Sequence, residues 1–176
     1  MTRWVPWVAP LLGVSARLAH AKLLMTQEEA LAKAFPGAVS IERKTLFLTS
    51  AQMKRIETLA GAKVESQIFT YYEGKNATGS LGKAFFDTRV VRTMPMTFMA
   101  LIQPDGSLGF VEILAFHEPE DYLPRFSWLK LYKNRRLTDA FRLRRDIPNV
   151  TGASLTCQTI HDGVRTLLAV HQMEIS

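Results

Sequence analysis

The stretch PMTFMALI-QPDGS-LGFVEILAF, residues 95–116, decides the fold of this chain. Pro95–Ile102 and Leu108–Phe116 are nearly continuous apolar runs, and Gln103–Gly106 between them combines Pro, Asp and Gly. Pro presets one φ angle, Asp bonds its own backbone and Gly accepts a positive φ, so Gln103–Gly106 predicts a tight turn. Two such runs on either side of a turn predict neighbouring antiparallel strands. Pro95–Ile102 is nearly all apolar, which predicts a strand near the centre of the sheet.

Further strands are predicted upstream at a similar spacing. Ser66–Tyr72 alternates between two faces, Leu81–Val91 is centred on an aromatic pair, and Glu73–Asn76 predicts the turn between them. An extended segment over 38–48, with Ile41 and Phe47 as its apolar anchors, precedes them. Turns at this spacing indicate an antiparallel meander. The predicted fold class is α+β, an antiparallel β-sheet meander flanked by helices.

Helices are predicted on both sides of the strand-rich region. Thr26 and Glu29 form a capping box for the first helix, and Gly61 stops the second. In the third helix, Phe126, Leu129 and Tyr132 are expected to point inward. The predicted helices cover residues 26–35, 50–60, 124–132 and 157–173.

The first 21 residues have the order of a secretory signal peptide. A basic residue, Arg3, precedes a short apolar region that ends near Val14, and the small-x-small triplet Ala19-His20-Ala21 follows. The apolar region is too short to span a bilayer as a helix. Residues 1–21 are therefore predicted to direct export to the periplasm or another extracytoplasmic space. The alternatives are a retained anchor and a partly packed apolar arm.

Composition narrows the function classes. The chain carries 22 Lys and Arg against 16 Asp and Glu, a net charge of +6, which becomes +4 once residues 1–21 are removed. That charge does not indicate nucleic-acid binding, and the basic run 130–145 has few aromatic residues for stacking. The four histidines lie at no metal-ligand spacing, so no metal site is predicted. Cys157, the only cysteine, is expected to be a small buried residue.

The hexapeptide Thr151-Gly152-Ala153-Ser154-Leu155-Thr156 is the candidate site for chemistry. It places three hydroxyl residues directly before an apolar-periodic helix. The first turn of a helix presents free N–H groups and the positive end of the helix dipole, which together suit a phosphate group. The alternative is an ordinary helix start, in which Thr151 or Ser154 caps the helix and Gly152 makes the turn.

The hexapeptide resembles the (Ser/Thr)-Gly-Ala-(Thr/Ser)-x-(Thr/Ser) signature of the FMN-binding domain family. That family includes the G subunit of the Rnf electron-transport complex, the C subunit of the sodium-translocating NADH:quinone reductase and small exported flavoproteins. The resemblance implies that Ser154 is joined covalently to FMN through a phosphoester. It also implies that a magnesium-dependent flavin transferase makes this bond with FAD as the donor.

Other segments resemble the family in the same order. Leu108–Leu114 is similar to the strand before the flavin loop, Glu118–Tyr122 to a Glu-(Thr/Pro)-x-Gly-Tyr loop, and Trp128–Tyr132 to a Trp-x-x-x-Phe helix. The resemblance covers about residues 79–171, so 79–176 is assigned as the FMN-binding core and 22–78 as an N-terminal segment of the same domain. The chain departs from the pattern at Pro148 and Asp121, where the family keeps Asp and Gly.

The resemblance implies a function and a set of site residues. The chain would be an exported, monomeric flavoprotein that exchanges electrons with a membrane-bound redox partner, without catalytic residues of its own. The alternatives are a flavin-dependent reductase with its own small acceptor and a non-redox binding module without flavin. Arg144 or Arg145 would add charge-assisted bonds to the phosphate. The implied FMN-binding residues are Ser154, Thr151, Gly152, Ala153, Thr156, Glu118, Tyr122 and Trp128.

Overall fold

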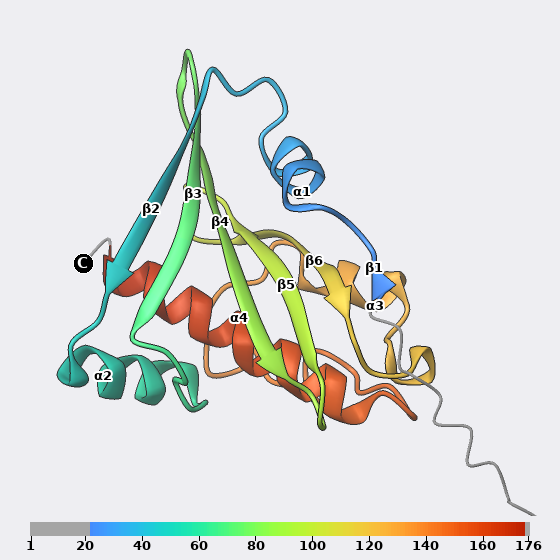
Figure 1. The fold of residues 1–176 in the computed structure, drawn as a ribbon. Helices are drawn as coiled ribbons and strands as arrows, with labels where there is room; N and C mark the ends of the chain where they lie inside the picture. Colours follow the sequence, from blue (N-terminus) through green and yellow to red (C-terminus); the bar gives the residue numbers. More distant parts are fainter. Residues whose placement is uncertain (1–21, 175–176) are drawn as a thin grey trace, which may run out of the picture.

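The computed structural model describes residues 22–174 and shows one sheet with helices on both faces (Figure 1). The sheet has six antiparallel strands in the order β1-β6-β5-β4-β3-β2, so strands β2 to β6 form a continuous meander. The strands are β1 (Lys22–Leu23), β2 (Ser40–Phe47), β3 (Ile68–Asn76), β4 (Gly79–Val90), β5 (Pro95–Ile102) and β6 (Leu108–Phe116). The helices are α1 (Gln27–Ala34), α2 (Ser50–Ala60), the 3₁₀ turn η1 (Glu120–Tyr122), α3 (Phe126–Leu129), the 3₁₀ turn η2 (Lys130–Tyr132) and α4 (Ser154–Glu174).

The α+β class and the antiparallel meander are confirmed, and the stretch 95–116 forms the predicted hairpin. β5 and β6 begin and end at the predicted residues. In the turn, Asp105 accepts hydrogen bonds from the Ser107 amide and hydroxyl, and Gly106 has a φ of 81°. β5 lies between β4 and β6, where both of its edges are hydrogen-bonded. A nearly continuous apolar run suits this position because side chains on both faces of the strand are buried.

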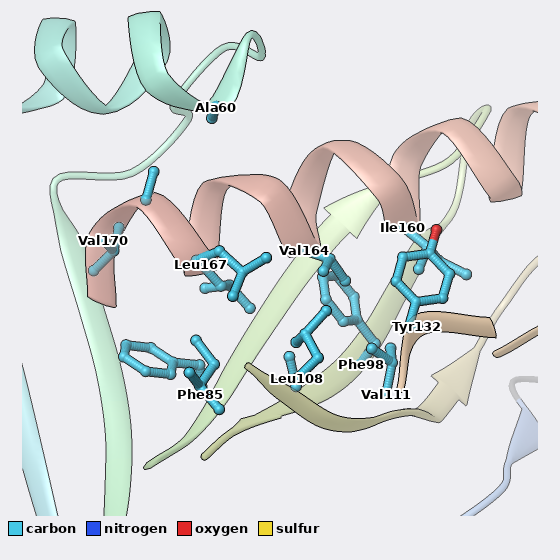
Figure 2. Close-up of a cluster of buried hydrophobic side chains, with 14 of the residues drawn as sticks. Ala60, Phe85, Phe98, Leu108, Val111, Tyr132, Ile160, Val164, Leu167 and Val170 are labelled. Atoms are coloured by element: carbon cyan, nitrogen blue, oxygen red, sulfur yellow. The ribbon is translucent and has the colours of Figure 1, made fainter. Parts of the chain in front are cut away.

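The larger core lies between the sheet and α4, which crosses one face of it (Figure 2). Val164 and Leu167 of α4 are fully buried toward Phe85 and Phe98 of the sheet. Gly163 lets the helix approach closely, since a Cβ there would come 2.5 Å from the Phe98 ring. Burial at this density contributes roughly 1.5–3 kcal/mol per large apolar side chain. This packing holds the N-terminal end of α4 in place, and the hexapeptide leads into that end.

A smaller core lies on the opposite face, under α1. Ala30 and Ala34 are buried against the sheet side chains Met99 and Leu114. The predicted capping box of α1 is confirmed, because Thr26 and Glu29 bond each other's backbone amides. α2 begins and ends at the predicted residues and carries a capping box of its own.

Four local predictions were wrong. Glu73–Asn76 is not a turn but the end of β3, and Gly74 is required there because a Cβ would lie 2.4 Å from the Phe35 ring. Ile41 and Phe47 do not anchor β2, because this edge strand leaves them 43% and 74% exposed. Phe126 points outward and Trp128 is buried in its place. α4 also starts three residues earlier than predicted.

His161 and His171 are both buried on α4. The surroundings of His161 favour its uncharged form. Its Nε2 accepts the Leu143 amide proton at 3.1 Å, and its Nδ1 lies 3.3 Å from the Tyr132 hydroxyl. Burial, reinforced by the positive charge of Arg165, lowers the pKa of His161 to about 4.

Acid is therefore expected to destabilise the protein through His161. The unfolded chain takes up a proton near pH 6.5, whereas the folded chain does so only near pH 4. The free energy of unfolding should fall as pH falls through this window, by up to about 1.4 kcal/mol per pH unit. Urea titrations between pH 7 and pH 4 measure it. His161→Gln keeps an acceptor for the Leu143 amide and should flatten the decline, and a variant with an unchanged slope would contradict this assignment.

Candidate functional site

The hexapeptide forms a tight turn that runs into α4. The Ala153 amide donates to the Val150 carbonyl at 3.1 Å, and Gly152 has a φ of 86°, a conformation that glycine adopts without strain. Ala153 is buried and α4 begins at Ser154. The Cys157 amide makes the first i→i−4 bond, to Ala153. The amides of residues 154–156 precede that bond, so they are oriented outward from the helix end.

The Ser154 hydroxyl is half-buried at this helix end. Asn149 Nδ2 donates to Ser154 Oγ at 2.8 Å, and Oγ donates to the Val150 carbonyl at 3.3 Å. Asn149 Oδ1 is buried and has no hydrogen-bond partner among residues 22–174. The two bonds of Oγ differ from the helix cap that the alternative interpretation assigned to Ser154. The hydroxyl is oriented by the preceding loop, beside a buried polar atom that is left unsatisfied.

Ser154 lines a small pocket of about 150 Å³ together with Arg92 and Tyr122. The Arg92 guanidinium lies 4.6 Å from the centre of the Tyr122 ring, within the range of a cation–π contact. The buried Thr156 hydroxyl donates to the Tyr122 carbonyl at 2.6 Å and ties the 120–122 turn to α4. One wall of the pocket is thus cationic and aromatic, and the opposite wall is the start of a helix.

Glu118 organises the neighbouring hairpin turn. Its Oε1 accepts the amide protons of Arg92, Thr93 and Met94 at 3.2, 2.8 and 2.9 Å. These bonds hold the pKa of Glu118 below its usual range, and the bond from the Thr93 amide has the largest effect. The carboxylate is buried, and it orders the turn between β4 and β5 from which Arg92 extends. Glu118 therefore acts on the pocket through the position of Arg92.

A larger cleft of about 510 Å³ lies on the other side of the hexapeptide. Trp128 forms part of its wall and is fixed there, because its indole Nε1 donates to the Pro148 carbonyl at 2.6 Å. Ala153 borders both cavities, so the hexapeptide separates them. The lining residues of the cleft are Asp121, Leu123, Arg125, Ser127, Trp128, Leu131, Val150, Thr151 and Ala153.

The structure brings most of the sequence-predicted site residues together around one turn. Thr151, Gly152, Ala153, Ser154 and Thr156 form it, with Tyr122 on one side and Trp128 on the other. Glu118 does not line the pocket, because its Oε1 accepts hydrogen bonds from the β4–β5 turn.

The predicted and observed cations differ. Arg144 and Arg145 border neither cavity, whereas Arg92, which sequence reasoning missed, borders the smaller one. Arg92 lies in a short turn 62 residues before Ser154 and belongs to no local motif. The β4–β5 hairpin and the packing of α4 on the sheet together bring it to the site. The buried position of Cys157 is confirmed, and burial raises the pKa of its thiol.

Within residues 22–174, no three metal-binding side chains gather at one point. In the same part of the chain, no helix combines the length and the apolar character needed to cross a membrane. No family model, curated protein or solved structure matches the chain.

Proposed function

We propose that this protein carries FMN, joined through a phosphoester to Ser154, and exchanges electrons with a membrane-bound redox partner. The observation that carries the proposal is the position of the Ser154 hydroxyl. It lies at the start of a 21-residue helix, in a pocket that also contains the guanidinium of Arg92. Bound FMN supplies one- and two-electron redox chemistry, and the protein supplies attachment and electrostatics.

The residues around Ser154 fit a phosphoester. Esterification removes the Oγ proton and with it only the long bond to the Val150 carbonyl, while Asn149 Nδ2 can still donate to the ester oxygen. The first-turn amides of α4 and the Arg92 guanidinium are donors for a phosphate group. Ser154 would take the FMN phosphoryl group from FAD by breaking its diphosphate bond, with AMP as the leaving group.

The larger cleft fits a flat ring with a polar edge. About 510 Å³ lies inside the roughly 300–1,000 Å³ range of small-molecule sites. Leu123, Trp128 and Val150 supply apolar walls, and Ser127 and Thr151 supply hydroxyl groups at the same cleft. The cleft begins at the hexapeptide itself, so a ring attached at Ser154 would have its slot within reach. A cleft open to the surface also suits electron exchange with a docked partner.

The test is a spectrum of the purified protein after it has been produced together with a flavin transferase. Flavin absorbance should remain with the polypeptide through acid precipitation, and the peptide containing Ser154 should gain the mass of an FMN ester. Colourless protein with an unmodified Ser154 peptide would refute the proposal.

Arg92 is expected to bind the phosphate of the cofactor. In protein that is produced without the transferase, Arg92→Gln should weaken the binding of free FMN about tenfold. This is the effect expected from the loss of one charge-assisted hydrogen bond. Riboflavin has no phosphate, so its affinity should stay the same. Fluorescence titration measures both ligands, and Arg145→Gln is the charge-matched control outside both cavities. Equal losses of FMN and riboflavin affinity would show that Arg92 does not recognise the phosphate.

A further inference from the structure

The exposed surface of α3 and η2 combines basic and apolar side chains. Trp128, Leu129 and Tyr132 are buried and anchor this segment to the core. Phe126 and Leu131 point away from it and are 55% and 39% exposed. Other apolar side chains of this protein are also exposed, but these two occupy one short helical segment that is rich in basic residues.

Basic residues surround the two apolar side chains. The segment 122–138 contains no Asp or Glu, and its basic residues Arg125, Lys130, Lys133, Arg135 and Arg136 are all exposed. Arg136 is paired with Asp105, and no ion pair engages the other four among the described residues. We refer to residues 125–136 as the basic ridge.

Two hollows flank the basic ridge. The larger cleft of about 510 Å³ borders the ridge through Leu131, and a groove of about 420 Å³ borders it through Phe126, Lys130 and Lys133. Leu131 lines the cleft and Phe126 lines the groove, and both side chains remain more than a third exposed. Two exposed apolar side chains among unpaired cations suit contact with the headgroup region of an anionic bilayer.

The N-terminal strand β1 joins the sheet close to the segment that leads into the basic ridge. β1 pairs with the end of β6, and the Lys22 ammonium forms an ion pair with Glu120 of η1, the turn that precedes α3. Residues 1–21, which contain the apolar region before Val14, are attached to β1.

We propose that the basic ridge docks this protein onto an anionic phospholipid bilayer, with Phe126 and Leu131 entering the headgroup region. The docking needs no flavin. One consequence rests on the proposed function. The larger cleft would be held at the membrane surface, where a membrane-embedded redox partner lies. An acidic protein surface is the alternative occupant, and it predicts no response to lipid.

The test places an environment-sensitive fluorophore on the ridge of the full chain through Ser127→Cys. Ser127 is exposed between Phe126 and Trp128, and the native Cys157 is buried and shielded from the label. Addition of vesicles that contain phosphatidylglycerol should brighten the label and shift its emission to the blue, and phosphatidylcholine vesicles should not. High salt should reverse the change. The same label at Ala51→Cys, on α2 away from α3, reports non-specific contact.

Two double variants separate the contributions. Lys130→Glu with Lys133→Glu should weaken the response to phosphatidylglycerol vesicles tenfold or more, because attraction to the bilayer grows with each basic residue. Phe126→Ser with Leu131→Ser should abolish the blue shift. The matched controls are Lys54→Glu with Lys63→Glu and Phe47→Ser with Ile68→Ser, exposed residues away from the ridge, which should change nothing.

Both ridge variants alter exposed side chains, so thermal melting should confirm an unchanged fold. No response of the Ser127 label to anionic vesicles would overturn the proposal, as would an equal response of the Ala51 label. Because all of these measurements use flavin-free chain, they succeed or fail independently of the phosphoester at Ser154.

Discussion

Ser154→Ala is expected to give a protein without covalently bound flavin. The alanine side chain has no oxygen to form the ester, and the neighbouring hydroxyls do not take its place. Thr156 is fully buried and its hydroxyl donates to the Tyr122 carbonyl. Thr151 lines the larger cleft and not the pocket that contains Ser154. In-gel fluorescence after denaturing electrophoresis, together with the mass of the tryptic peptide, measures the loss. We expect it to be complete.

Matched variants separate the role of Ser154 from that of its neighbours. Ser154→Thr keeps a hydroxyl at the same position and should retain attachment, whereas Thr151→Ala should leave it unchanged. Ser154→Ala should also melt within a few degrees of the parent chain, because it removes only two part-buried hydrogen bonds. Flavin that still comigrates with Ser154→Ala would place the attachment on another residue or exclude a covalent bond.

Arg165→Met is expected to cost about 3 kcal/mol of folding free energy. Arg165 is 5% exposed on α4, and its guanidinium joins the helix to two other segments. Its Nε donates to the Ala60 carbonyl and Nη2 donates to that of Leu59, at the C-terminal end of α2. Its Nη1 donates to the carbonyls of Thr138 and Phe141.

Methionine fills a similar volume but leaves these carbonyls without donors. A buried acceptor that loses its partner costs roughly 1–3 kcal/mol, and removal of the buried charge offsets part of the sum. Urea denaturation measures the change. Arg142→Met removes a neighbouring exposed cation that bonds one carbonyl, so it should cost under about 1 kcal/mol. A loss for Arg165→Met no larger than that of Arg142→Met would show that the ties to α2 contribute little.

Local patterns were sufficient for three of the regular elements. The apolar runs on either side of Gln103–Gly106 predicted β5 and β6 with their correct bounds, and the helical pattern that stops at Gly61 did the same for α2. These signals act between residues close in sequence, so the sequence displays them directly. Gly74 was misinterpreted for the opposite reason: its neighbour is the ring of Phe35, which belongs to another segment.

The candidate site divides in the same way. The sequence by itself determined the hexapeptide, with its hydroxyls, its turn glycine and the helix that follows, because these features depend on consecutive residues. Only the tertiary structure decided that Arg92 stands at Ser154 and that Glu118 orders the turn carrying Arg92. Those residues come from different hairpins and loops, and the packing of α4 on the sheet brings them together. The charge and shape of the pocket therefore depend on the packed core, whereas the hydroxyl it presents depends on the chain alone.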